Sequence, residues 1–138
     1  MKITWLGHAG FRIEIADRIL LVDPWFTGNP VFPEGRRDEA VAGVTDILVS
    51  HGHGDHSGDA VGLAKELGVA VAGIYDLMTH WQATEGIEIV GFNKGGTSRR
   101  GDVAVTMVSA THSSSVATDH GPMYAGAEAG FMIAGEGR

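Results

Sequence analysis

The residues that could do chemistry are concentrated in the run SHGHGDHS at positions 50–57, which holds His51, His53, Asp55 and His56. Imidazole nitrogen and carboxylate oxygen are the ligands that borderline divalent cations accept when no thiolate is offered, and the chain has no cysteine. The intervening glycines can take backbone angles closed to other residues, which lets neighbouring side chains converge. The run therefore predicts a metal site. The alternative is a solvated polar loop.

The elements around this run must present it at the end of a strand. Residues 47–49 are apolar and predict a short buried strand that ends where the histidines begin. A second strand is predicted over residues 103–108, and His112 follows its end. Ligands gather beyond the carboxyl ends of strands in open α/β sheets, so we expect His112 to be a ligand as well. A lone histidine is otherwise more often a surface residue or a satisfied core residue.

The rest of the pattern predicts a fold of the α/β (α+β) class. Apolar runs bounded by turn residues predict strands, and helical spacing with a glycine past the end predicts helices. Their succession gives a β-meander followed by a βαβαβ run. The expected strands cover residues 3–6, 11–15, 19–22, 47–49, 69–72, 87–90 and 103–108, and residues 124–134 are expected to form a last strand or a strand pair. The expected helices cover residues 60–67 and 75–84, and the expected loops cover 24–43, 94–101 and 116–122.

The loop over residues 24–43 carries three of the four prolines and the aromatic residues Trp25, Phe26 and Phe32. Long loops are often functional, so these rings could line a substrate entrance. They could equally form a satellite core that pins the loop, and the sequence leaves both readings open.

Composition sets the broad class. A chain of 138 residues, 43% hydrophobic and 20% charged, predicts one globular domain over residues 1–138. A formal charge of -7 argues against binding to a phosphate backbone, so we do not expect a nucleic-acid partner. No stretch reaches the ~18 apolar residues of a membrane span, and no signal peptide is visible, so cytoplasm is the default expectation.

Together these motifs resemble the metallo-β-lactamase superfamily. The resemblance rests on the run at 50–57 with Leu6-Gly7-His8, Leu21-Val22-Asp23-Pro24 and Thr111-His112-Ser113-Ser114-Ser115. It is strongest to the prokaryotic metal-dependent hydrolases related to the lactonase-like branch, and it covers nearly all of the chain. The fold that it implies is an αββα sandwich with a binuclear site at one edge of the two sheets, of which this chain matches the N-terminal half to two-thirds.

The resemblance also implies a ligand set. It makes His51, His53 and His112 the ligands of one metal, and Asp55 with His56 ligands of a second. The family pattern continues past the equivalent of Arg138 to a strand-end Asp that bridges the metals and to a later His. Asp119 and His120 are the remaining ligand-type pair, but they match neither motif.

Further roles follow from the same resemblance. Asp55 would orient the nucleophile. Asp23 would support the histidine loop, residues 50–57, although Asp23-Pro24 could also be a plain strand-ending turn. His8 lies near the site by motif and would face substrate with Trp25 and Phe26; as a turn residue, His8 would need no such role.

Two functions are compatible with these residues. The first is a hydrolase that uses metal-bound hydroxide to cleave an ester, lactone, amide or phosphodiester in a small molecule. Zn²⁺ is the expected ion, Mn²⁺ or Fe²⁺ are alternatives, and two ions are expected if the site is completed. The second is a non-catalytic or incomplete metal-binding half that needs a complementing chain or a partner copy, with about one metal per chain.

Overall fold

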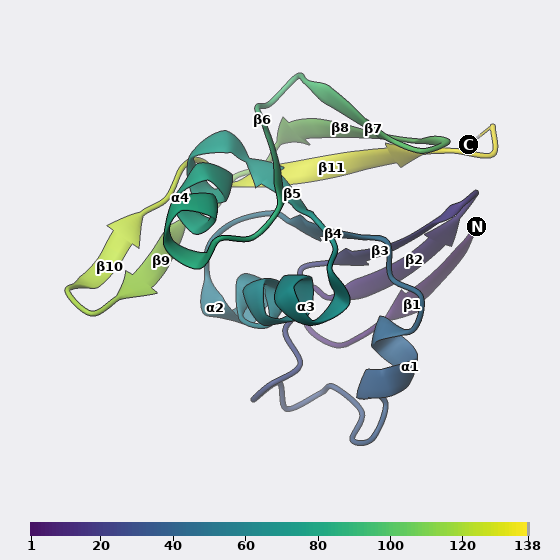
Figure 1. Cartoon of the computed structure of the whole chain (residues 1–138), viewed down its shortest axis with the longest axis horizontal. Coiled ribbons are helices and arrows are strands. Elements are labelled where there is room, and N and C mark those ends of the chain that lie inside the picture. Colours follow the sequence, from purple (N-terminus) through teal and green to yellow (C-terminus); the bar gives the residue numbers. More distant parts are fainter. Residues whose placement is uncertain (138) are drawn as a thin grey trace.

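The computed structural model describes residues 1–137 as three layers (Figure 1). The central layer, sheet A, has the strand order β1-β2-β3-β4-β5-β6, and sheet B beside it has the order β11-β8-β7. Sheet A consists of β1 (Lys2–Trp5), β2 (Phe11–Ile15), β3 (Arg18–Val22), β4 (Asp46–Val49), β5 (Val71–Ile74) and β6 (Ile89–Phe92). Sheet B consists of β7 (Thr97–Arg100), β8 (Val103–Ser109) and β11 (Ala129–Ala134).

Helices and one hairpin complete the described fold. The helices are α1 (Arg37–Val41), α2 (Gly54–Ser57), α3 (Ala60–Leu67) and α4 (Tyr75–Glu85), and the hairpin pairs β9 (Ser115–Thr118) with β10 (Gly121–Tyr124). Figure 1 shows α1 and α3 on one side of sheet A, with sheet B on the other side. This α/β layering confirms the predicted fold class for the part of the domain that residues 1–137 form. Within those residues, no helix is long and apolar enough to cross a membrane.

Sheet A changes direction at β3. Strands β1, β2 and β3 form the predicted antiparallel meander, whereas β3, β4, β5 and β6 run parallel. Parallel neighbours need crossover connections, and α3 and α4 supply two of them. Because β3, β4 and β5 are parallel, their carboxyl ends meet at one edge of the sheet. Asp23 and the histidine loop both begin at that edge.

The two faces of sheet A are buried in different ways. Ile47 and Val71 are register partners that pack in the same cluster as Leu63 of α3 and Leu77 of α4. The next row, Leu48 and Ala72, packs in a second cluster with Val103 and Val105 of β8. Residues Ile47, Leu48 and Val71 are fully buried. Strands buried on both faces read as continuous apolar runs, which is why the sequence predicted β4 as a short buried strand.

A buried ion cluster ties the start of β4 to sheet B. Asp46 is 1% exposed and forms salt bridges with Arg100 on β7 and Arg18 on β3. A buried carboxylate is tolerated only when it is paired in this way. The cluster therefore fixes how sheet B sits against the strand that delivers the histidines.

Three predicted loops contain regular structure. The predicted turn over residues 94–101 includes β7, because Gly95 and Gly96 make the turn and the next four residues pair with β8. The predicted loop over residues 116–122 is wrong, since the β9–β10 hairpin occupies it. Of the strand or strand pair expected over 124–134, the structure has one strand, β11, which begins only at Ala129, and the last residue of β10. Helix α1 interrupts the loop over 24–43, and β5 and β6 each lie two residues later than predicted.

Candidate metal centre

The histidine loop leaves the carboxyl end of β4 and turns at once into α2. Gly52 is required at this turn, because a Cβ there would lie 2.8 Å from both the Ser115 carbonyl oxygen and Val116 Cγ1. The Ser57 hydroxyl donates to the carbonyl oxygens of Gly52 and His53, at 3.0 Å each. These contacts place the loop directly against the segment that follows β8, which carries His112.

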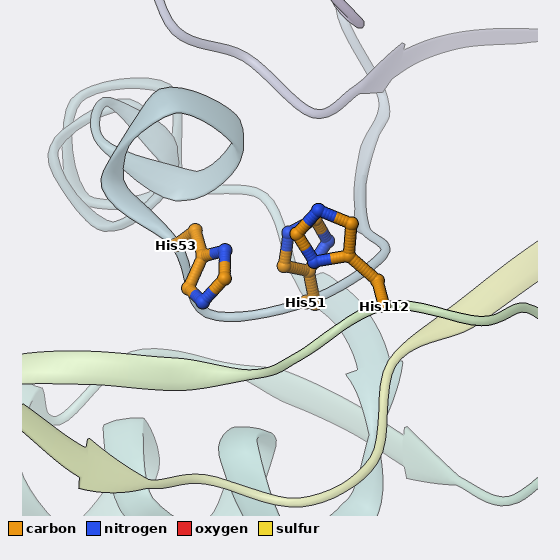
Figure 2. A group of neighbouring side chains, drawn as sticks. All are labelled: His51, His53 and His112. Carbon is orange, nitrogen blue, oxygen red and sulfur yellow. The ribbon is translucent and has the colours of Figure 1, made fainter.

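Three histidines converge there from two segments. One ring nitrogen each of His51, His53 and His112 lies within 4.8 Å of the other two. The ring centroids of His51 are 4.7 Å from those of His53 and 4.6 Å from those of His112. Figure 2 shows the three rings gathered between the loop and the His112 segment. The structure thus brings together the set that the resemblance assigned to one metal.

A hydrogen-bond relay fixes the orientation of His51. The Asp23 carboxylate accepts the Ser50 backbone N–H at 2.7 Å and the Ser50 hydroxyl at 2.6 Å. Because that hydroxyl has only one hydrogen, it must accept the bond of 2.9 Å that it shares with His51 Nδ1. His51 therefore carries its proton on Nδ1, and its Nε2 keeps a free lone pair.

His56 and His112 are oriented in the same way. The Nδ1 of His56 donates to Asp23 Oδ2 at 2.9 Å, and the Nδ1 of His112 donates to the Ser113 carbonyl oxygen at 2.8 Å. In the neutral ring, each bond fixes the tautomer that leaves Nε2 as the acceptor. Asp23 thus holds the histidine loop through two of its rings, and it does so with a left-handed backbone (φ 45°) that aspartate tolerates better than most residues.

The protonation of two rings is shifted in opposite directions. Burial, aided by the positive charge of neighbouring His56, lowers the pKa of His51 from 6.5 to about 4. Burial also disfavours the charged form of His56, but its hydrogen bond to Asp23 and the charges of Asp23 and Asp55 outweigh this and raise the pKa of His56. At neutral pH, His51 is accordingly a neutral base, the form in which imidazole binds metals.

The burial of His51 also fits a divalent cation bound at the three histidines. His51 is 4% exposed, and its Nε2 has no hydrogen-bond partner among the described residues. An unpaired buried acceptor costs roughly 1–3 kcal/mol, so such atoms call for an explanation. A cation held by the three imidazoles would satisfy this lone pair.

The residues expected to face substrate separate into two groups. His8 lies at the cluster: its Nε2 is 3.1 Å from Asp55 Oδ2, and its ring meets Trp25 edge-on at 5.5 Å between centroids. Phe26, by contrast, is buried and stacks on Phe32 at 4.5 Å. For Phe26 the geometry therefore favours the satellite-core alternative, while half-buried Trp25 lies beside the polar cluster.

Other candidate polar residues lie apart from the cluster. Asp119 and His120 sit at the turn of the β9–β10 hairpin and join none of the groups of potential ligands found in residues 1–137; neither does His80 on α4. A hollow of about 460 Å³ between β1, β2 and the α1 segment also contains no histidine. Its two arginines are both committed, Arg12 to the Ala40 and Ala42 carbonyl oxygens and Arg36 to the Glu39 carboxylate, so the hollow offers no free guanidinium.

Sequence reasoning missed two contributors. Ser50 relays Asp23 to His51, and its only signal was its place directly before the first histidine. Ser114 is buried and its hydroxyl accepts the Gly52 backbone N–H at 3.4 Å, a contact between residues 62 positions apart. Both roles depend on partners that are distant in the sequence.

A helix-covered mixed sheet, a second sheet packed on it, and a histidine cluster at their common edge define a metallo-hydrolase class of fold. The family model described as "Beta-lactamase superfamily domain" matches residues 18–138. The chain belongs to the metallo-β-lactamase superfamily.

Curated relatives point to one group within it. A "UPF0173 metal-dependent hydrolase" of Dinoroseobacter shibae is 73% identical over 138 residues, which are 100% of this chain and 60% of the relative. One of Paracoccus denitrificans is 61% identical over 137 residues, 99% of this chain and 60% of the relative. The chain thus spans about 60% of the length of the curated relatives that it matches.

A solved structure shows the same fold. Igni18, described as a novel metallo hydrolase from the hyperthermophilic archaeon Ignicoccus hospitalis, superposes with a TM-score of 0.81 at 26% identity. The match covers 99% of this chain and 56% of Igni18.

Proposed function

We propose that the protein is a metal-dependent hydrolase that cleaves an ester, lactone, amide or phosphodiester bond in a small molecule, with its centre at His51, His53 and His112. The observation that carries the proposal is the buried, unpartnered Nε2 of His51 among two further imidazoles. The names of the relatives support metal-dependent hydrolysis as the class of reaction.

A divalent cation, Zn²⁺ by preference, would supply Lewis-acid activation of water at neutral pH. Residues His51, His53 and His112 would hold it, and Asp23, acting through the Ser50 hydroxyl, would keep the Nε2 lone pair of His51 aimed at it. Asp55, at the start of α2, is half exposed and would accept hydrogen bonds from the attacking water and so orient it. Burial raises the pKa of Asp55, but a backbone hydrogen bond and then the charges of His56 and His8 together outweigh burial and lower it, so the carboxylate is ionised at neutral pH.

The experiment measures zinc content and turnover together. Wild-type protein should retain zinc through gel filtration and hydrolyse p-nitrophenyl acetate or bis(p-nitrophenyl) phosphate. His51→Ala should lose both properties. His120→Ala is the matched control, since it removes a histidine outside the cluster and should change neither. Unaltered zinc content in His51→Ala would contradict the assignment.

A second candidate function is metal binding without turnover, completed by a complementing chain or a partner copy. Met132 on β11 is 64% exposed, and β11 pairs only with β8 among the described strands. Such an uncovered apolar strand favours association. Zinc binding without hydrolysis, together with a native mass above that of one chain, would favour this candidate. Cytoplasmic location stays a prediction in either case.

A further inference from the structure

The segment over residues 125–129, which joins β10 to β11, is fixed against the core at two points. A Cβ on Gly126 would lie 3.0 Å from Asp76 Cβ at the start of α4, so the segment packs closely there. Ala129 is 3% exposed, and its N–H donates to the Ser50 carbonyl oxygen at 2.9 Å. The segment is therefore bound to the histidine loop.

Glu128, inside this segment, contacts the other part of the chain that carries a ligand. Its carboxylate accepts the backbone N–H of His112 and lies 3.8 Å from Lys94 Nζ. Hydrogen bonding to its own backbone N–H, then the charge of Lys94 and the N–H of His112, lower the pKa of Glu128 against the effect of burial. Its side chain is 20% exposed, the lowest value among the ion-paired glutamates of residues 1–137. The carboxylate is thus a charged acceptor held between Lys94 and His112.

His112 lies outside the ladder bonds of the sheets. Strand β8 ends three residues before it, and β9 begins three residues after it. In the described part of the chain, residues 111–114 form no backbone–backbone hydrogen bond. Its ring must nevertheless stay beside two rings of another segment, at 4.6 Å from His51 and 5.1 Å from His53 between centroids. The backbone of His112 therefore needs an anchor, and Glu128 supplies one.

We propose that Glu128 is a positioning residue of the metal centre, which holds the main chain of His112 at the distance from the histidine loop that the three imidazoles require. The inference rests on the proposed function, because it assigns a role within the same centre. Glu128 and Ala129 are neighbours: one contacts His112 through its carboxylate, and the other contacts Ser50 through its N–H. Together they join the two segments that supply the ligands.

A surface ion pair with Lys94 explains these contacts less well. Exposed ion pairs contribute little to stability, and 3.8 Å is longer than a charge-assisted hydrogen bond. Such a pair also gives Glu128 no reason to face the backbone of His112. By contrast, removing groups that orient metal ligands typically lowers metal affinity roughly 10–100-fold.

The experiment is a double-mutant cycle on zinc affinity, measured for the 138-residue chain by competition with a chromogenic chelator. Glu128→Ala should bind zinc at least about tenfold more weakly than wild type. Glu128→Gln keeps an oxygen that can accept the His112 N–H, so its affinity should stay within about threefold of wild type. In the His112→Ala background, where the positioned ring is absent, Glu128→Ala should have no further effect. Glu85→Ala is the matched control, since it removes the glutamate of another Lys–Glu pair, and it should bind zinc like wild type.

Urea unfolding of the metal-free variants separates positioning from folding. Glu128→Ala and Glu85→Ala should have similar urea midpoints, and a markedly lower midpoint for Glu128→Ala would assign Glu128 a role in folding instead. The inference is overturned if Glu128→Gln loses zinc affinity as Glu128→Ala does, or if Glu128→Ala binds zinc like wild type. An equal loss in the His112→Ala background would overturn it too. Loss of zinc in His51→Ala would in each case leave the proposed function standing, whereas a wild type that binds no zinc would overturn both.

Discussion

Replacing one oxygen of Asp23 by nitrogen, in Asp23→Asn, tests whether hydrogen bonds set the tautomers of the metal centre. The carboxylate is 5% exposed and accepts three bonds: from the Ser50 backbone N–H, the Ser50 hydroxyl and His56 Nδ1. Ionised carboxylates only accept, so every proton in the relay has a determined position. The relay therefore leaves Nε2 unprotonated in His51 and in the neutral form of His56.

The amide of Asp23→Asn cannot satisfy the same partners. Its oxygen must remain on the Ser50 backbone N–H, because an unpaired buried N–H costs roughly 1–3 kcal/mol. Its NH₂ group then donates to His56 Nδ1 and to the Ser50 hydroxyl. That hydroxyl turns and donates to His51 Nδ1. Both rings thereby move their proton to Nε2, the atom that a cation needs.

Cation binding to this variant has to reverse these bonds. When a ring returns its proton to Nδ1, that N–H faces the N–H or O–H donor that had been bonded to Nδ1, so two donors face each other without an acceptor. One such pair of opposed donors costs about 1–3 kcal/mol, and every 1.4 kcal/mol is a tenfold change in affinity. We expect zinc affinity at the site of His51, His53 and His112 to fall roughly 10–100-fold. The free energy of unfolding of the metal-free protein should fall by only about 1–2 kcal/mol, as charge-assisted bonds become neutral ones.

Imidazole ¹H–¹⁵N correlation spectra report the tautomers of the metal-free protein directly, and competition with a chromogenic chelator gives the zinc affinity. Asp46→Asn is the matched control: it also removes a buried carboxylate with charged partners, but none of them is a histidine. It should lower stability and leave the tautomers unchanged. The reasoning is refuted if Asp23→Asn keeps both rings protonated on Nδ1, or if its zinc affinity stays within about threefold of wild type.

Three further predictions concern the scaffold. Gly52→Ala should lower the free energy of unfolding in urea by roughly 1–3 kcal/mol, because its Cβ would lie 2.8 Å from the Ser115 carbonyl oxygen. The control is Gly62→Ala, in an exposed position of α3 where a Cβ would have no atom within 4 Å, and it should raise that free energy by about 0.5–1 kcal/mol. Asp46→Ala should cost about 3–5 kcal/mol in the same assay, since it leaves Arg18 and Arg100 with no carboxylate between them, and a loss below 1 kcal/mol would contradict the buried pairing. In metal-free protein, the lowered pKa of His51 makes the free energy of unfolding fall as pH drops from 6.5 toward 4, by at most roughly 3 kcal/mol. The raised pKa of His56 has the opposite effect, because the stability that it contributes is lost as pH rises through that pKa. Urea midpoints should therefore decline from pH 6.5 to pH 4 in wild type, with a shallower decline in His51→Gln.

The sequence predicted those features whose signal is local. Ligand types and spacing predicted the histidine loop, and apolar runs predicted β4 as a buried strand. The sequence did not predict strand β7, because its two arginines are typical of a solvated turn. Arg100 lies inward because it pairs with Asp46, which is distant in the sequence. The relay through Ser50 and the meeting of His8 with Asp55 join residues 27 and 47 positions apart. Such contacts follow from strand pairing, which no local pattern specifies.

Strand register is consequently part of the chemistry of this centre. In the β3–β4 pair, Val22 is the partner of Leu48, and the Asp23 N–H donates to the Leu48 carbonyl at 2.9 Å. Asp23 is thereby held beside Ser50, the first residue after β4, and reaches its N–H and hydroxyl together. Because side chains alternate along a strand, a slip by one residue would turn the apolar faces of β4 over as well as break this relay. The burial of Ile47 and Leu48 on opposite faces therefore excludes the slip, and the packing of the core determines which nitrogen of His51 is free to bind a cation.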